Sequence, residues 1–276
     1  MKNIRANEWV KDGEDGWFNG YYDNHGRKVE GVMDESVRMM LTGQVFAIMS
    51  GTATEDQVES ICRSADKYLY DQKAGGYRLN TNFHEEKFDL GRMFGFAYGE
   101  KENGAVFSHM AVMYANALYK QGFIKEGYKV LKTLLDTAMD FDRSRMYPGV
   151  PEYFDNDGRG LYSYLTGAAS WYMLTMITSV YGVHGELGDL VIEPALMPQQ
   201  YNEKGDAKVS LEFAGHGFDI LVHNPDKLEP GDAQVKRALC DDVKVENVTG
   251  NSVRIPRHAI EMLSTDKCHT VEIYIE

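Results

Sequence analysis

The residue best suited to chemistry is a histidine at the expected start of an apolar helix. A polar run begins at Lys101 and leads into an apolar segment whose first turn carries His109. A helix N-terminus offers free N–H donors and a partial positive charge, and Lys101 and His109 add further donors. This arrangement suits an anion or a polar sugar. Spacing alone leaves an alternative open, a buried histidine whose ring bonds a backbone carbonyl.

A second candidate is the pair Thr166-Gly167, which precedes another apolar segment. Thr166 is a natural N-cap, and Gly167 allows a ligand to approach the backbone N–H groups. A hydroxyl beside exposed amides forms a cradle for an anion. The alternative interpretation is a capped helix with Trp171 packed in the core.

Carboxylates and aromatic rings are frequent in the expected loops. A glycosidase needs two carboxylates that face each other across a sugar, and aromatic rings can stack on sugars or pack in a core. Most acidic residues of a strongly acidic chain are solvated. The carboxylates are Asp15, Asp23, Glu30, Glu102, Glu152 and Asp155, and the rings are Trp17, Phe18, Tyr21, Tyr22, Tyr147, Tyr153, Tyr162 and Tyr164.

Charge and composition exclude several function classes. The 276 residues include 42 acidic and 29 basic side chains, a formal net charge of −13, and no basic run. Such a field repels phosphate backbones and anionic lipid, so we expect no nucleic-acid or membrane partner. The N-terminus lacks the apolar stretch of a signal peptide, and no segment approaches the roughly 18 apolar residues of a membrane helix.

The sequence contains no motif for a bound nucleotide, a structural metal or a catalytic serine. It has no Walker loop, GxGxxG, GxSxG, HExxH or EF-hand pattern. Its three cysteines, Cys62, Cys240 and Cys268, are widely spaced, which indicates neither a disulfide framework nor a zinc site and favours a reducing cytoplasm. From the residues alone we therefore expect a carbohydrate-type or anion-type site without a metal or cofactor.

The elements that must position these residues change character near residue 188. Before it, apolar residues recur with a period of about 3.6, and after it they alternate. Thr54 to Gln57 reads as a capping box that starts a helix, and Gly75-Gly76 stops the helical run. Further helices are predicted at about 33–50, 104–121, 124–139 and 166–181, with long functional loops at 12–31, 74–103 and 144–165.

The last third of the chain predicts a small antiparallel β domain. Alternating apolar residues indicate strands near 191–193, 209–213, 218–222, 243–245, 253–255 and 271–275. We therefore expect a mainly α protein with a C-terminal β domain, divided into residues 1–187 and 188–276.

Several motifs of this chain resemble the inverting glycoside phosphorylases of the cellobiose phosphorylase family, glycoside hydrolase family ninety-four. The stretch KENGAVFSHMAVMYANALY, from Lys101 to Tyr119, carries the resemblance. Later motifs follow in that family's order: Pro151-Glu152-Tyr153, Arg159-Gly160, residues 164–171, Gly182-Val183-His184-Gly185 and Glu193-Pro194. Upstream, residues 16–24, Val29-Glu30-Gly31 and residues 75–81 are most similar to the branch that acts on β-1,2-linked glucans.

The resemblance implies the second half of an (α/α)6 toroid at 1–187, followed by a jelly-roll-like antiparallel β-sandwich at 188–276. It implies cleavage of a β-glycosidic bond by inorganic phosphate, a co-substrate, with inversion to an α-sugar 1-phosphate. It implies phosphate-binding roles for His109, Thr166 and Gly167. Sugar contacts are implied for Lys101, Glu152, Trp17 and Tyr21.

One departure from the family pattern concerns the general acid. In the family this is an aspartate of an Asp-Trp type segment upstream of the KENG region, and no such segment occurs here; Asp15-Gly16-Trp17 belongs to a later loop. We therefore expect no catalytic acid in this chain, which resembles a C-terminal portion that is inactive alone. It would self-associate or bind an upstream companion polypeptide, because half a toroid exposes apolar faces.

Three other functions remain open at this point. The chain resembles the phosphorylase-like part of a cyclic β-1,2-glucan synthase as well. A non-catalytic carbohydrate-binding or assembly module would retain sugar binding without phosphate dependence. A hydrolase would use water activated by a loop carboxylate and would not respond to phosphate.

Overall fold

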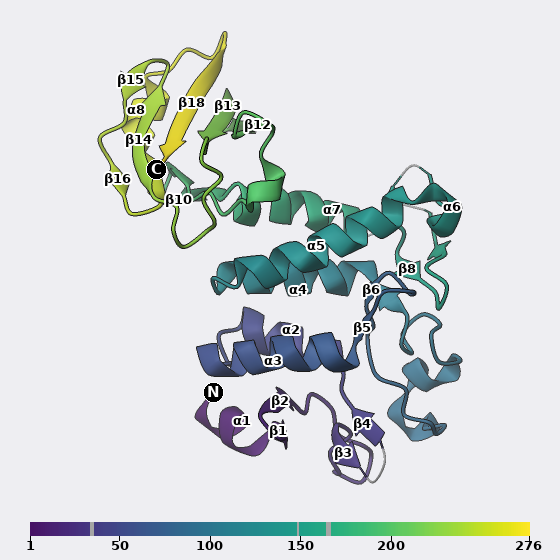
Figure 1. Cartoon of the computed structure of the whole chain (residues 1–276). Coiled ribbons are helices and arrows are strands. Elements are labelled where there is room, and N and C mark those ends of the chain that lie inside the picture. The colour runs from purple at the N-terminus through teal and green to yellow at the C-terminus, as the bar shows by residue number, and fades with distance from the viewer. Residues whose placement is uncertain (34–35, 148, 164–166) are drawn as a thin grey trace. The chain divides into compact units, whose positions relative to one another are not determined.

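The computed structural model describes residues 1–33, 36–147, 149–163 and 167–276 (Figure 1). Within them the chain forms two compact units, Met1–Tyr172 (unit 1) and Met173–Glu276 (unit 2). Unit 1 carries the larger helices and unit 2 the larger sheets, so the helical and β parts follow each other as expected. The assignment of 1–187 to half a toroid and of 188–276 to a jelly roll stays a prediction.

Four helices form the body of unit 1. Helix α4 packs against both α2 and α5, as Figure 1 shows, and is buried on most of its surface. A helix that is buried on several sides must be apolar nearly all round, which explains why most residues of α4 are small or apolar. The four are α2 (Leu41–Met49), α3 (Glu55–Tyr68), α4 (Ser108–Lys120) and α5 (Ile124–Met139).

The start of α3 is confirmed as a capping box. The Thr54 hydroxyl accepts from the Gln57 N–H, and the Gln57 side chain accepts from the Thr54 N–H at 3.1 Å. These bonds satisfy N–H groups that a helix start leaves without an intrahelical partner. The predicted helix at 124–139 is likewise confirmed, as α5.

The predicted helix at 33–50 is wrong in its first part. Strands β3 (Gly31–Met33) and β4 (Ser36–Arg38) pair instead, and α2 begins only at Leu41. The backbone around Met39 is held extended by residues 79–81: the Thr81 N–H donates to the Met39 carbonyl at 3.0 Å, and the Leu41 N–H to the Leu79 carbonyl at 2.8 Å. This pairing between distant segments overrides the local helical pattern.

A small three-stranded sheet replaces the expected helical start at 104–107. It joins β7 (Val106–Phe107), β8 (Tyr153–Phe154) and β9 (Gly160–Leu161) in that order. The sheet therefore brings residues 153–154 and 160–161 to the start of α4. Helix α7 spans Gly167–Thr175 and continues as the π-helical turn η3 (Met176–Val180), close to the predicted helix at 166–181.

The remaining elements of unit 1 are short. They are α1 (Lys2–Asn7), β1 (Trp9–Asp12), β2 (Asp15–Phe18), β5 (Tyr70–Asp71), β6 (Gly76–Tyr77), the 3-10 turns Phe88–Leu90 and Arg92–Gly95, and α6 (Phe141–Ser144).

Unit 2 contains two sheets over a common apolar core. Phe218, Ile220, Val253, Val271 and Ile273 are among its fully buried side chains. One sheet has the order β10-β11-β17-β16 and the other β12-β13-β18-β14-β15. The elements are β10 (Val183–Glu186), β11 (Asp189–Ile192), the 3-10 turn Pro198–Gln200, β12 (Asp206–Phe213), β13 (His216–His223), β14 (Val235–Cys240), β15 (Val243–Lys244), β16 (Val248–Thr249), β17 (Ser252–Ile255), α8 (Arg257–Glu261) and β18 (Cys268–Ile275).

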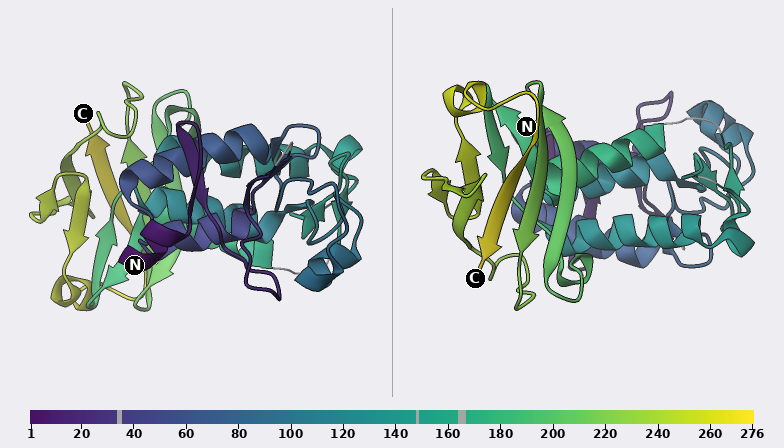
Figure 2. Two further views of the ribbon diagram at one scale, coloured as in Figure 1. Left: turned by 90° about the horizontal axis from the view of Figure 1, so that it is seen from below. Right: turned by 90° about the horizontal axis from the view of Figure 1, so that it is seen from above.

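The expectation of a wholly antiparallel β domain is wrong for one strand pair. Strand β18 runs parallel to β13, with Ile220 opposite Val271, and antiparallel to β14 on its other side. Figure 1 and the right-hand view of Figure 2 show β18, in yellow, within this sheet. Alternating apolar residues indicate that one face of a strand is buried, but they carry no information on strand direction.

No helix in the described part of the chain is both long enough and apolar enough to cross a bilayer.

Candidate functional site

His109 and Gly167 lie in direct contact although 57 residues separate them in the sequence. His109 is the second residue of α4, and Gly167 is the first of α7. A Cβ added at Gly167 would lie 2.4 Å from Cε1 of the His109 ring. Only glycine fits there, because real Cβ atoms do not approach a ring so closely. The contact brings the beginnings of two helices together.

The start of α4 is fixed by the three-stranded sheet. The Ser108 N–H donates to the Glu152 carbonyl at 2.9 Å, and Phe107 pairs with Tyr153 across β7 and β8. This N–H is one of the donors that a helix start leaves without an intrahelical acceptor. Glu152 and Tyr153 thus fix the position of the first turn of α4, which carries His109.

Aromatic rings surround the His109 imidazole. The ring centres of Phe107 and Trp171 lie 5.9 Å and 5.7 Å from it. Phe107 also stacks on Tyr153 at 4.7 Å, and Tyr153 contacts Tyr162 edge-on at 6.0 Å. Contact with these two rings restricts the orientation of the imidazole.

The Nε2 atom of His109 is buried and has no hydrogen-bond partner in the described residues. Burial lowers the pKa of His109, and the negative charge of Glu152 opposes this shift. A buried nitrogen left without a bond is unfavourable, so a ligand that bonds it gains stabilisation.

Lys101 lies beside this aromatic group. Its Nζ is 5.0 Å from the ring centre of Phe96 and 5.1 Å from that of Tyr162. A hydrogen bond with Tyr162 raises the pKa of Lys101, so the ammonium is charged at neutral pH. Lys101 adopts a positive φ of 46°, which turns the chain sharply before Glu102.

Two carboxylates accompany these donors. Oε2 of Glu102 is buried without a hydrogen-bond partner in the described residues, and Oε1 lies 3.5 Å from Arg92. Burial raises the pKa of Tyr153, and the charges of Glu102 and Glu152 add to that rise. The site thus combines a histidine, an ammonium and two carboxylates.

The other candidate carboxylates have structural roles. Asp15 accepts from Arg63 at 3.2 Å. Asp23 and Asp155 each close a turn by accepting N–H groups two and four residues later, and these bonds and Arg27 hold the pKa of Asp23 at about 2. Asp23 and Asp155 are thus engaged within their own turns, and Asp15 is held by Arg63 of α3.

Trp17 does not fit the expected sugar contact. Its side chain is 0% exposed, its Nε1–H donates to the Arg38 carbonyl at 3.2 Å, and its ring packs edge-on against Tyr68 at 5.8 Å. A ring without free surface has no face for a sugar. Trp17 packs in the core, which is the alternative interpretation given above for such rings.

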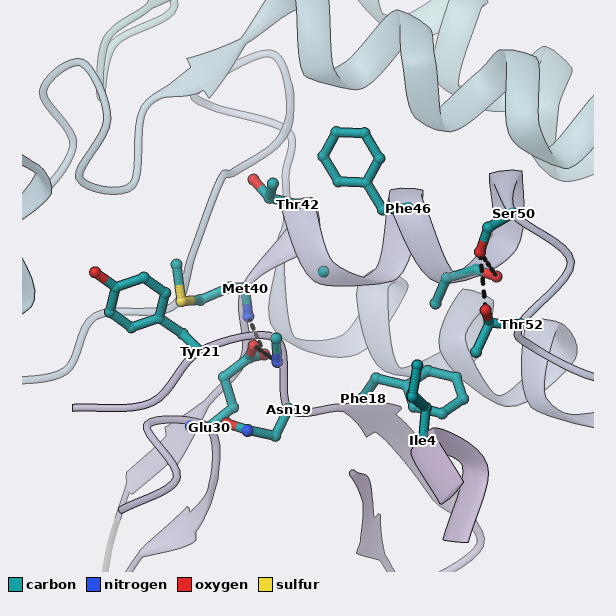
Figure 3. Close-up of a pocket in the computed structure, with 13 residues that line it drawn as sticks. Ile4, Phe18, Asn19, Tyr21, Glu30, Met40, Thr42, Phe46, Ser50 and Thr52 are labelled. Atoms are coloured by element: carbon teal, nitrogen blue, oxygen red, sulfur yellow. Dashed lines mark hydrogen bonds between the residues drawn. The ribbon is translucent and has the colours of Figure 1, made fainter. Parts of the chain in front are cut away.

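Tyr21 is 42% exposed and lines a separate pocket of about 350 Å³ (Figure 3). Glu30 lies at this pocket and is almost completely buried. Its Oε1 accepts from the Gly20 N–H and its Oε2 from the Met40 N–H, each at 2.7 Å. Burial raises the pKa of Glu30 to about 8, and the two N–H donors limit the rise. The pocket shares no lining residue with the His109 site.

Among the predicted site residues, His109 contacts Gly167, the Glu152 carbonyl accepts from the N–H of the residue before His109, and Lys101 lies beside Tyr162. Trp17 lies in the core and Tyr21 lines the pocket of Figure 3. Thr166 lies outside the described residues. Within the described chain, no group of three or more His, Cys, Asp or Glu residues is arranged to hold a metal ion.

Sequence reasoning missed Phe96, Phe107 and Arg92 as neighbours of the site. Phe96 and Arg92 come from the long segment before the KENG run, and only the fold brings them to Lys101 and Glu102. The available signal was the density of aromatic residues in that segment.

Comparison with known proteins identifies relatives of this chain. The family model described as "Glycosyl hydrolase 94 superfamily, catalytic domain" matches residues 1–182. Cellobionic acid phosphorylase of Neurospora crassa is 28% identical over 252 residues, covering 83% of this chain and 31% of the relative. Solabiose phosphorylase of Paenibacillus borealis is 24% identical over 88% of this chain and 31% of its own length.

A third relative is N,N'-diacetylchitobiose phosphorylase of Vibrio proteolyticus, 26% identical over 80% of this chain and 28% of its own length. The chain therefore spans about three tenths of the length of these curated relatives. A solved GH92 alpha-mannosidase from Bacteroides thetaiotaomicron is 15% identical, covering 94% of this chain and 27% of its own, with a TM-score of 0.28. A similarity that low supports no argument about the fold.

Proposed function

The chain belongs to the glycosyl hydrolase 94 superfamily, and from this we propose that it supplies the phosphate-binding side of a glycoside phosphorylase site. The curated relatives above are phosphorylases of different disaccharides, which supports the reaction type. The single observation that carries the proposal is the buried, unpartnered Nε2 of His109 in contact with the first residue of α7.

The chemistry explains why such a site is needed. One carboxylic acid protonates the leaving oxygen while phosphate attacks the opposite face of the sugar, so the anomeric centre inverts. Phosphate is already a nucleophile and replaces the water that a hydrolase would have to activate. Because its charge must be held close to the sugar, neutral and cationic donors have to grip it.

We assign phosphate binding to His109, the Thr166 hydroxyl and the Gly167 backbone N–H. An imidazole N–H, a hydroxyl and a helix-start amide are donors, and the amide has no intrahelical acceptor. Burial of the imidazole among aromatic rings strengthens a bond to an anion, since little water competes for it.

We assign sugar binding to Lys101, Glu102 and Glu152. Ammonium and carboxylate groups bond sugar hydroxyls, and the unpartnered Oε2 of Glu102 is an acceptor that a hydroxyl would satisfy. Tyr153 and Tyr162 add ring surface beside them. Tyr21, which lines the Figure 3 pocket, stays a proposed sugar contact at a distinct position.

The general acid is proposed to lie on the part of the catalytic domain that this chain does not include. The preferred substrate is a β-1,2-linked gluco-oligosaccharide, on the motif resemblance at residues 16–24 and 75–81, and the product is α-glucose 1-phosphate. The helices of unit 1 would then form part of an (α/α)6 toroid, completed by a second copy or by an upstream companion polypeptide.

Release of glucose 1-phosphate from β-1,2-gluco-oligosaccharides and inorganic phosphate tests the proposal. We expect no turnover by the chain alone, turnover after addition of the upstream segment of a relative, and loss of that turnover in His109→Ala. The matched control is His25→Ala, an exposed histidine of a surface loop.

Three outcomes would contradict the proposal. Turnover that does not depend on phosphate would identify a hydrolase. Activity of the chain alone would show that one of its own carboxylates is the acid. Sugar binding without turnover in either preparation would favour a non-catalytic carbohydrate-binding module.

A further inference from the structure

A second pocket, with aromatic walls, lies in the segment that precedes the KENG run. It has a volume of about 540 Å³, within the range of roughly 300–1,000 Å³ typical of small-molecule sites. Its walls include Phe83, Phe88, Phe94, Phe96 and Tyr98. Phe88 is 72% exposed, so its ring is free to contact a ligand.

Polar groups at the same pocket define what it can hold. Asn82, Glu85 and Glu86 contribute an amide and two carboxylates to its lining. Rings that offer apolar faces, beside oxygen acceptors, match a neutral sugar, whose C–H face is apolar and whose edge carries hydroxyl donors. Glu85 is neutralised by ion pairs with Arg38 and Lys87, while the exposed Glu86 carboxylate repels a phosphate ion. The lining therefore favours a neutral glycan over an anion.

Contacts within the segment make the pocket a formed structure. Phe83 and Phe94 pack with ring centres 5.4 Å apart, and the Arg38 guanidinium lies 5.1 Å from the Phe83 ring while forming an ion pair with Glu85. One wall is thus anchored to β4, outside the segment itself.

The other wall is tied to the proposed sugar site. The Asn103 side chain donates to the Phe96 carbonyl at 2.8 Å, and the Gly99 N–H donates to the Asn103 carbonyl at 2.6 Å. Phe96 lies 5.0 Å from the Lys101 ammonium, and Asn103, which also lines the pocket, follows Glu102 directly. The pocket and the proposed sugar-binding residues therefore share a wall.

We propose that this pocket is an additional glycan subsite, which binds glucosyl units beyond the one held at Lys101 and Glu102. The inference rests on the proposed function, because it takes those residues to contact the sugar. It implies that the chain binds neutral gluco-oligosaccharides more tightly as they lengthen, through stacking on Phe88 and Phe96.

Calorimetric titration of the full chain with β-1,2-gluco-oligosaccharides of increasing length, from the disaccharide upwards, tests the subsite. In Phe88→Ala we expect the affinity for the longer oligosaccharides to fall about tenfold, the scale of one lost aromatic stacking contact, and the affinity for the disaccharide to stay unchanged. The matched control is Tyr147→Ala, which removes an aromatic ring that is 78% exposed and does not line the pocket.

A second variant, Glu86→Gln, replaces an exposed acceptor without removing a ring and keeps the test independent of any folding defect in Phe88→Ala. We expect Glu86→Gln also to lower the affinity for the longer oligosaccharides selectively. Any of four results would overturn the subsite. These are an affinity that does not rise with oligosaccharide length, an equal loss of affinity at all lengths in either variant, no change of affinity in either variant, and a chain that binds no oligosaccharide at all.

Titration with inorganic phosphate separates this inference from the proposed function. Phosphate binding that is lost in His109→Gln and kept in Phe88→Ala supports both assignments. A chain that binds long oligosaccharides selectively but does not bind phosphate would contradict the phosphorylase proposal and leave the subsite standing. Phosphate binding without length-dependent glycan binding would overturn the subsite alone.

Discussion

At the scale of single residues, Gly167 is the position where one added carbon should matter most. In Gly167→Ala the new Cβ would meet the His109 ring at 2.4 Å, so either the ring or the start of α7 must move. We expect phosphate affinity, measured by calorimetry, to fall at least tenfold, because the donors lose their common geometry.

The matched control for Gly167 is Gly95→Ala. A Cβ at Gly95 meets nothing within 4 Å and Gly95 has no positive φ, so phosphate affinity should stay unchanged. Equal affinities in the two variants would show that the contact between His109 and Gly167 does not shape the site.

Glu30 predicts a pH dependence of stability. Its pKa in the folded chain is about 8, above its usual 4.5, so the folded state holds a proton that the unfolded chain releases. The stability that this proton confers is fully present below pH 4.5 and is lost as the pH rises to about 8. Urea unfolding over this range should give a free energy of unfolding that decreases with pH.

Glu30→Gln should remove that slope. It should also lower stability at acidic pH by about 1–3 kcal/mol, because the amide NH₂ would face a backbone N–H of Gly20 or Met40. Glu14→Gln, at an exposed position, should keep the slope. A slope that survives in Glu30→Gln would assign it to other groups.

The residues of the candidate site differ in how far they could be predicted. His109, Lys101 and Gly167 stand in short motifs whose donor chemistry is visible in the sequence; the structure places Gly167 against His109 and Lys101 beside Tyr162. Trp17 was wrongly expected to contact sugar, because a sequence does not show whether an aromatic ring faces the core or solvent. The Phe88 and Phe96 pocket depends on loop geometry, for which the sequence has no periodic signal.

At the scale of elements, the capping box of α3 allows a direct test. Thr54→Ala removes the hydroxyl that accepts from the Gln57 N–H and should lower the free energy of unfolding by about 1 kcal/mol. Chemical denaturation followed by far-UV circular dichroism measures it.

Thr54→Ser keeps a hydroxyl at the same position and should retain most of the stability of the capping box. If the serine variant were as unstable as the alanine variant, the loss would come from the threonine methyl group and its packing, and the box itself would contribute little.

Helices and strands could be predicted from the sequence where local chemistry decides them. The predictions were wrong where pairing between distant segments decides the structure. The helices α3 and α5 follow from amphipathic patterns and a cap. The helical pattern at 33–40 is overridden by hydrogen bonds to residues 79–81. Strand β14 was missed because a bulge between Val235 and Arg237 interrupts its alternation.

At the scale of the whole molecule, exposed apolar side chains predict association. Leu135, Met139, Phe141 and Tyr147 are all exposed around the end of α5, and the Phe141 and Tyr147 rings lie 4.9 Å apart. Exposed apolar side chains gathered near one helix end favour contact with a second copy or a companion chain. We expect Met139→Lys with Phe141→Lys to reduce self-association in light scattering.

The control places the same charges elsewhere, in Val243→Lys with Met262→Lys, two exposed apolar residues of unit 2. This variant should associate as the parent chain does. Equal association of both double variants would locate the contact away from Met139 and Phe141.

The parallel pairing of β13 with β18 has a consequence for synthesis on the ribosome. Strand β18 lies between β13 and β14, so the sheet has a gap in its interior until residues 268–275 emerge. Strands β12 to β15 are translated earlier but cannot form their final sheet, and pairings this distant in sequence form slowly. During this interval the unpaired edges of β13 and β14 are exposed to other nascent chains, so chaperone demand should be greatest just before translation of this strand is complete.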